Sequence, residues 1–233
     1  MTLQPLLDHL QTLRPKGACW ILGITGAVAS GKSTLATALA ARIASWPGVG
    51  SVGQAGTDGF LFPNAELERQ GILGQKGFPE SYDRAGLESA LAAVRTGAAF
   101  FPGYSHVTYD IDPQLGHNFT HPDVLILDGL GFGDPANRLA VDCLIYLDAP
   151  DDDLQAWYVE RFIDFWRAAE TDPASFYARF RQMDEVAVRD LARSVWQGVN
   201  LPNLHKHILP LRSVADIVVV KTVDHQIVRL EFG

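Results

Sequence analysis

One glycine-rich stretch, GAVASGKST at residues 26–34, constrains the fold of this chain more than any other feature. It fits the pattern G-x-x-x-x-G-K-[ST], the signature of a phosphate-binding loop, or P-loop. Glycines at these positions let the backbone curl so that N–H groups point at phosphate oxygens, and the following helix presents its positive end to them. The residues predicted to hold the phosphates are Gly26, Ala27, Val28, Ala29, Ser30, Gly31, Lys32, Ser33 and Thr34.

The sequence around this loop predicts a strand before it and a helix after it. Residues 19–26 are apolar and end at glycine, as in a strand buried on both faces, and residues 32–46 have apolar side chains at helical spacing. Alternating strands and helices predict an α/β three-layer sandwich of the P-loop NTPase type, with a mainly parallel central sheet. Further strands are expected at 123–130, 142–150, 215–222 and 226–232, and further helices at 86–97, 151–169 and 183–198.

Residues 97–122 are rich in glycine and proline but also carry Phe100, Phe101, Tyr104 and Tyr109. We interpret this stretch as an ordered functional loop, because a flexible tether would not be so aromatic. The chain shows no internal repeat and no linker. We therefore treat residues 1–233 as one domain, with helices at about 151–198 forming a lid.

The composition argues against several kinds of partner. The 233 residues include 19 Lys and Arg against 27 Asp and Glu, and the net charge of −8 repels nucleic acids and anionic membranes. Cys19 and Cys143 lie in apolar stretches, which indicates buried free thiols in a reducing cytoplasm. No stretch resembles a secretory signal or a membrane span. The sequence does not decide between a monomer and a homodimer.

A P-loop predicts nucleotide binding without specifying a reaction. Lys32 would reach the β and γ phosphates and the Ser33 hydroxyl would bind magnesium, so ATP and Mg²⁺ are the predicted cofactors. GTPase switches, molecular motors and small-molecule kinases all use such a loop. The sequence shows no guanine-specificity motif and no partner-coupling region, which favours a phosphotransferase with Lys32 as a catalytic residue.

The stretch GTDGFLFPN contains an aspartate with two interpretations. Asp58 is either a turn former or a carboxylate held at the end of a strand to take a proton from a substrate. An intact P-loop upstream favours the carboxylate, since a phosphotransferase needs a group on the acceptor side. Gly59 would then leave room for the substrate to approach.

Eight short stretches carry a further signal: TDGFLFPN (57–64), KGFPESYD (76–83), YSHVTYD (104–110), LILDGL (125–130), YLDAP (146–150), WYVERF (157–162), TDPASF (171–176) and VNLPNLHKHILPLR (199–212). In this order and near these spacings, they closely resemble bacterial type I pantothenate kinases. These enzymes belong to the uridine kinase and phosphoribulokinase group of P-loop kinases, and the resemblance covers the chain from about residue 19 onward. Each stretch is weakly specific alone, and the ordered combination is highly specific.

The resemblance implies an enzyme that uses MgATP to phosphorylate the primary hydroxyl of pantothenate, the first step of coenzyme A biosynthesis. By position it implies that Asp58 orients or deprotonates that hydroxyl. It also implies substrate or phosphate contacts for a set of lid and pocket residues, and a place beside the adenine for His225. That set comprises Tyr104, His106, Tyr158, Arg161 and Asn200.

The spacing of the lid residues agrees with a shared site. Tyr158, Arg161 and Phe165 fall at i, i+3 and i+7, so a helix would present them on one face. Arg161 could then stabilise the transferring phosphoryl group as a catalytic residue, and Phe165 could join the substrate wall. The alternatives are core packing for Tyr158 and Phe165 and a surface ion pair for Arg161.

Two strand-end aspartates receive different interpretations. Asp128, in LILDGL, ends an apolar run at a place where an acidic residue would hold magnesium. Many relatives carry glutamate there, and the shorter aspartate side chain leaves direct metal contact open. Asp148 is expected to cap the helix that follows it.

Three functions remain after the sequence is considered. The leading one is an ATP-dependent pantothenate kinase. The second is a related kinase of a nucleoside, a sugar or glycerate, which gains support from His207 and Leu211 where the family more often has Asn and Thr. The third is a nucleotide-binding regulatory protein without kinase activity.

Overall fold

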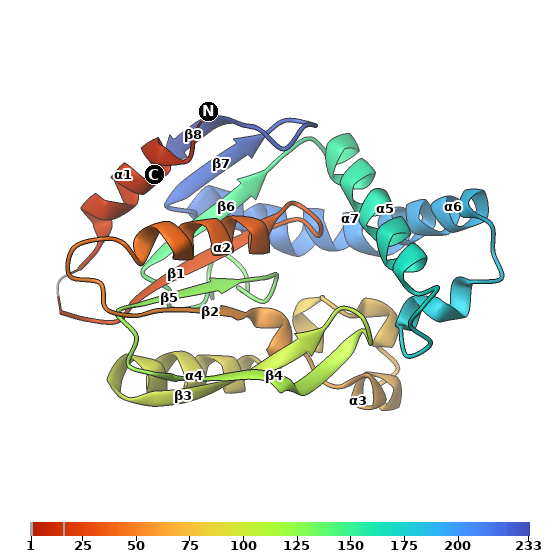
Figure 1. Cartoon of the computed structure of the whole chain (residues 1–233), viewed down its shortest axis with the longest axis horizontal. Coiled ribbons are helices and arrows are strands. Elements are labelled where there is room, and N and C mark those ends of the chain that lie inside the picture. Colours follow the sequence, from red (N-terminus) through yellow and green to blue (C-terminus); the bar gives the residue numbers. More distant parts are fainter. Residues whose placement is uncertain (1, 16) are drawn as a thin grey trace.

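A six-stranded sheet lies at the centre of the protein and buries apolar side chains on both faces (Figure 1). In the strand before the P-loop, Ile21 packs into one hydrophobic core, whereas Trp20, Leu22 and Ile24 pack into the other. The computed structural model describes residues 2–15 and 17–233. The strands of the sheet are β1 (Trp20–Gly26), β2 (Val52–Gly56), β5 (Val124–Asp128), β6 (Cys143–Asp148), β7 (Ile217–Lys221) and β8 (Ile227–Phe232).

The strand order in this sheet is β2-β5-β1-β6-β7-β8. All neighbouring pairs are parallel except β7 and β8, which are antiparallel. Trp20 pairs with Val124, and Leu22 pairs with Cys143, so β1 lies between two buried parallel strands. The predicted mainly parallel sheet is confirmed, and the carboxyl ends of β1, β2 and β5 meet at one edge, where ligands bind in open α/β sheets.

Helices cover both faces of the sheet, which completes the predicted three-layer sandwich (Figure 1). Helices α1 and α2 pack on one face, and α4 and the helical turns of residues 196–214 pack on the other. The Asp83 side chain accepts a hydrogen bond from the Gly86 N–H at 2.9 Å and so caps the start of α4. The helices are α1 (Gln4–Leu13), α2 (Lys32–Ile43), α3 (Asn64–Arg69), α4 (Arg84–Thr96), α5 (Asp151–Ala168), α6 (Glu185–Val195) and α7 (Leu201–Asn203).

The interpretation of residues 97–122 as a loop is wrong. They form an antiparallel hairpin of β3 (Ala98–Ser105) and β4 (Asp110–Thr120). Two of the three glycines in this stretch, Gly103 and Gly116, occupy places where the hairpin is too closely packed for a side chain. A Cβ on Gly103 would lie 2.3 Å from the carbonyl carbon of Leu115, and one on Gly116 would lie 2.3 Å from the Phe100 ring. The glycines therefore mark close approach of the strands.

Other boundaries differ from the sequence-based expectation. Helix α2 ends at Ile43 and not at residue 46, because the chain turns there before Pro47 and Gly48. The sequence did not predict α1, β2 or the helical stretch that follows α6. This stretch contains two π-helical turns, Trp196–Asn200 and Leu204–Ile208, which are uncommon and often occur at functional sites.

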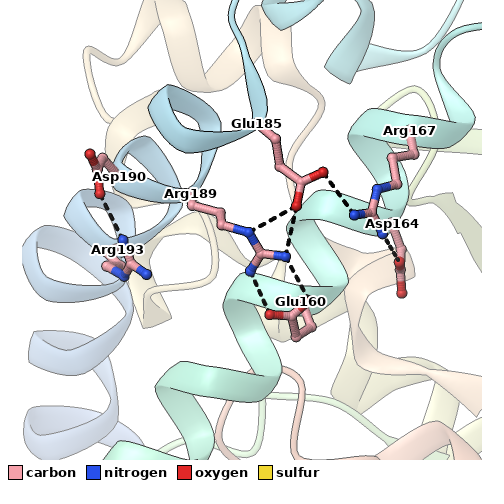
Figure 2. Close-up of polar contacts among 7 residues, drawn as sticks. All are labelled: Glu160, Asp164, Arg167, Glu185, Arg189, Asp190 and Arg193. Carbon is pink, nitrogen blue, oxygen red and sulfur yellow. Dashed lines mark hydrogen bonds and ion pairs between the residues drawn. The ribbon is translucent and has the colours of Figure 1, made fainter.

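The predicted lid consists of α5, α6 and the 3-10 turn Phe176–Phe180. It has a small hydrophobic core of its own, in which Phe162, Ile163, Tyr177 and Val188 are buried. Figure 2 shows two ion pairs that connect α5 to α6, Arg189 with Glu160 and Arg167 with Glu185, together with pairs within each helix such as Arg189 with Glu185. Exposed pairs of this kind contribute at most about 1 kcal/mol each. The lid therefore depends chiefly on its apolar core.

Within the described residues no helix has both the length and the apolar character needed to cross a membrane. Cys19 and Cys143 are buried and free, as the sequence predicted.

Candidate active site

The P-loop joins β1 to α2 at the carboxyl edge of the sheet and has the backbone that its glycines permit. Gly26 has φ 138° and Gly31 has φ 90°, both in the region that favours glycine. A Cβ on Gly26 would lie 2.5 Å from the carbonyl oxygen of Leu147 in the neighbouring strand. Ala29 adopts φ 62° without being glycine, so the loop holds backbone strain at the phosphate site.

The Lys32 side chain folds back over the P-loop. Its Nζ donates hydrogen bonds to the carbonyl oxygens of Gly26 at 3.2 Å and Ala27 at 2.8 Å. Burial lowers the pKa of Lys32 to about 8, although the nearby carboxylates of Asp58 and Asp128 oppose this shift. An anionic phosphate chain in this place would meet a partly desolvated ammonium group.

Ser33 and Asp128, the two predicted metal ligands, are in direct contact. The Ser33 Oγ donates a hydrogen bond to Asp128 Oδ2 at 2.6 Å. Burial raises the pKa of Asp128, and the hydrogen bond from Ser33 and the charge of Lys32 partly offset the rise. The described residues contain no cluster of three carboxylate, His or Cys groups. Two adjacent oxygens suit Mg²⁺, which takes few protein ligands and completes its shell with phosphate and water.

Asp58 lies in the 3-10 turn Thr57–Phe60, immediately after the end of β2. Its Oδ1 accepts a hydrogen bond of 3.0 Å from the hydroxyl of Tyr82. Tyr82 is buried, and burial together with the charge of Asp58 raises its pKa, so its hydroxyl keeps its proton. The sequence analysis missed Tyr82, although it lies in the quoted stretch KGFPESYD, because nothing local pairs it with Asp58.

The explanation of Gly59 as room for a substrate is wrong. A Cβ at this position would lie 1.8 Å from the carbonyl oxygen of Pro102 in β3. Gly59 therefore lets the hairpin backbone pack directly against the turn that carries Asp58. Phe60 is buried beside it and meets the Phe101 ring edge-on, with centroids 5.7 Å apart.

One cavity of about 1350 Å³ brings the predicted site residues together. It is lined by every residue predicted to be catalytic, substrate-binding or metal-binding, and by part of the P-loop. Gly26, Ala27 and Ser30 do not line it, since they lie behind the loop surface. The predicted residues that line it are Val28, Ala29, Gly31, Lys32, Ser33, Thr34, Asp58, Tyr104, His106, Asp128, Tyr158, Arg161, Phe165, Asn200 and His225.

Aromatic side chains from the hairpin and the lid face each other across one part of the cavity. The His106 ring centroid lies 5.1 Å from Tyr104 and 6.3 Å from Phe165. Desolvation by these walls and the charge of Arg161 lower the pKa of His106. The first π turn carries Asn200 into the cavity, where its side chain partly offsets the rise that burial gives to the pKa of Tyr158. This part of the cavity lies beside Asp58, and we call it the acceptor side after the role that the sequence predicts for Asp58.

Arg161 projects from α5 into the cavity. Its guanidinium carbon lies 5.4 Å from the Phe165 ring centroid. Over residues 2–15 and 17–233, Arg161 forms no hydrogen bond and no ion pair. The alternative interpretation, in which Arg161 forms a surface ion pair, is therefore wrong.

Lys76 is a second cation on the acceptor side that the sequence analysis missed. It is 9% exposed, and its Nζ donates hydrogen bonds to Asn64 Oδ1 at 2.6 Å and to the Tyr109 carbonyl at 2.7 Å. Burial lowers its pKa to about 8, while Asp110 and Asp58 oppose the shift. Lys76 forms no ion pair within the described part of the chain. An acidic acceptor would supply the missing negative charge.

His225 lies on the other side of the P-loop, in the turn between β7 and β8. Its ring stacks on Trp157 with centroids 4.1 Å apart, and Trp157 Nε1 donates a hydrogen bond to the Val223 carbonyl.

The prediction that Asp148 caps α5 is wrong. Its Oδ2 accepts a hydrogen bond from Arg212 Nε at 2.8 Å, and Pro150 stands at the start of the helix. The prediction failed because a distant arginine competes for the carboxylate.

The P-loop, the carboxylates at the ends of β2 and β5 and the helical lid over one cavity define a P-loop kinase of small molecules. No protein-family model matches the chain. A pantothenate kinase of a Mycobacterium strain is 43% identical over 217 residues, which are 91% of this chain and 70% of that protein. A pantothenate kinase of Xanthobacter autotrophicus is 40% identical over 221 residues, covering 89% of this chain and 68% of that protein.

Among solved structures, a protein described as a fructose transport system kinase from Silicibacter superposes with a TM-score of 0.72 and 25% identity. The match covers 91% of this chain and 95% of that one. The chain of 233 residues therefore belongs to the pantothenate kinase family, as its 43% and 40% identical relatives show.

Proposed function

We propose that this protein transfers the γ-phosphoryl group of ATP to the primary hydroxyl of pantothenate. The hydroxyl oxygen forms a bond to the γ-phosphorus, the bond from that phosphorus to the bridging oxygen of ADP breaks, and Asp58 accepts the hydroxyl proton. The observation that carries the proposal is the position of Asp58, at a strand end in the same cavity as Lys32 of the P-loop.

The remaining charged residues have roles that follow from their places. Lys32 binds the β and γ phosphates, and Arg161, free of other polar contacts in the described chain, neutralises charge on the transferring group. Ser33 and Asp128 would hold Mg²⁺, which when bound neutralises phosphate charge. Positioning and charge neutralisation supply most of the acceleration in such reactions.

The acceptor side of the cavity favours an anionic substrate. Lys76 and Arg161 line it without ion-pair partners among the described residues, and pantothenate carries a carboxylate. Tyr104, His106 and Phe165 provide aromatic walls for its carbon chain. The free thiols Cys19 and Cys143 support a further proposal, that the enzyme works in the reducing cytoplasm.

A coupled assay of ADP release with several acceptors tests the reaction. We expect turnover with pantothenate and none above background with uridine, glycerate or hexoses. Turnover with one of the other acceptors alone would replace the acceptor assignment and keep the kinase. No acceptor-dependent turnover at all would overturn the proposed function.

The variant Asp58→Asn tests the proton acceptor. We expect kcat to fall at least about a hundredfold, the lower end of the contribution of a general base, while the ATP dissociation constant stays near the wild-type value. Asp152→Asn is the control, because Asp152 is exposed and does not line the cavity. A variant at Asp58 that turns over at the wild-type rate would show that another group takes the proton.

A further inference from the structure

Lys221, the last residue of β7, reaches the back of the P-loop from a distant part of the chain. Its Nζ donates a hydrogen bond to the carbonyl oxygen of Ser30 at 2.7 Å. A Cβ on Gly31 would lie 2.9 Å from the same nitrogen, so the P-loop glycine leaves room for this ammonium group. The motif that binds phosphate and the lysine of β7 are thus fitted to each other.

Lys221 also contacts the base side of the cavity. Its Nζ lies 3.4 Å from His225 Nδ1 and 5.1 Å from the centroid of the Trp157 ring. Those two rings are stacked on one another at the place proposed for the adenine. The ammonium group therefore stands between the phosphate loop and the base side of the same cavity.

Among the described residues, no carboxylate forms an ion pair with this cation. Lys221 is half-buried. Its partners are a carbonyl oxygen and an imidazole nitrogen, and desolvation lowers its pKa. A cation that is partly removed from water without an anion is unfavourable, and an anionic ligand in the cavity would remove this cost.

We propose that Lys221 is a second nucleotide-binding lysine, which contacts the phosphate nearest the base, the α-phosphate. This inference rests on the proposed use of ATP. The P-loop backbone cradles the α- and β-phosphates and Lys32 reaches the β- and γ-phosphates. Lys221 lies on the side of His225 and Trp157, so it is placed to give the α-phosphate a side-chain cation. Lys32 and Lys221 approach the phosphate chain from two different elements, α2 and β7.

Equilibrium binding of adenosine, AMP and ADP, measured without any acceptor, tests this assignment. We expect wild-type protein to bind AMP more tightly than adenosine, and Lys221→Met to remove that preference. The affinity of the variant for ADP should fall about tenfold or more, as expected for a charge-assisted contact, while adenosine binding stays within about twofold. Lys221→Arg should retain most of the ADP affinity, since it keeps the charge.

Lys206→Met is the matched control, because Lys206 is exposed and does not line the cavity. Equal weakening of adenosine and ADP in Lys221→Met would assign Lys221 to the base and overturn the proposal. Weaker ADP binding with an unchanged preference for AMP over adenosine would reduce Lys221 to a support of the loop, which also overturns it. Because no acceptor is present, these results do not depend on which alcohol the enzyme phosphorylates.

Discussion

The lowered pKa of Lys32 predicts that ATP binding weakens in mildly alkaline solution. An ordinary lysine keeps its proton far above pH 9, but burial lowers the pKa of this one to about 8. Lys32 is therefore mostly charged below pH 8 and mostly neutral above it. Since the ammonium form is the one that attracts phosphate, affinity is highest at neutral pH and falls as the pH rises.

The size of the effect follows from the same value. If only the protonated enzyme binds ATP, the apparent dissociation constant is multiplied by one plus ten raised to the difference between pH and pKa. That factor is about 1.1 at pH 7, about 2 at pH 8 and about 11 at pH 9. Between pH 7 and pH 9 binding should thus weaken about tenfold, which corresponds to about 1.4 kcal/mol.

The assay is equilibrium binding of ATP at pH 7 to 9, at constant ionic strength and without acceptor, so that Lys76 on the acceptor side does not contribute. Adenosine is the control ligand, because without phosphates its affinity should not follow the charge of Lys32. The Lys32→Ala variant should bind ATP weakly and lose most of the pH dependence. An ATP dissociation constant that stays level to pH 9 would refute the reasoning.

The next two predictions concern the surroundings of Asp58. Tyr82→Phe removes the hydroxyl that donates to this carboxylate, so kcat should fall about tenfold with little change in the melting temperature; an unchanged kcat would contradict the contact. Gly59→Ala should lower the free energy of unfolding by about 1–3 kcal/mol, because the new Cβ would meet the Pro102 carbonyl, and the melting temperature should fall with it. Chemical denaturation of Gly59→Ala and of the control Gly198→Ala measures this loss. A Cβ at residue 198 meets nothing within 4 Å, so the control should keep the wild-type free energy of unfolding.

The sequence was sufficient for five of the six strands of the central sheet, all but β2, and for the predicted residues at its carboxyl edge. Gly31, Lys32 and Ser33 belong to one local motif, and Asp128 closes an apolar strand, so local patterns could place these four. Asp58 follows β2, which is only weakly apolar, and its place came from the P-loop upstream and from the resemblance of the stretch around it. Which roles these residues play in the reaction stays a prediction until the variants are measured. Family membership, by contrast, is confirmed by relatives that match most of the chain.

Groups that act across the fold could not be predicted in this way. Tyr82 meets Asp58 across 24 residues, and Lys221 meets Ser30 across 191 residues, with no local pattern to signal either contact. The hairpin at 98–120 was misinterpreted for a related reason. Its glycines look like loop residues in isolation, and only the facing strand reveals that a side chain would not fit there.

The separate core of the lid has a consequence for engineering. Phe162, Ile163, Tyr177, Val188 and Ala192 are buried against one another and not against the sheet. A segment that buries its own apolar residues can be exchanged between related proteins with few changes at its borders. A chimaera in which residues 159–192 of this chain are replaced by the equivalent segment of a related kinase should fold. Its choice of acceptor would show what the lid contributes to specificity, separately from the hairpin of β3 and β4.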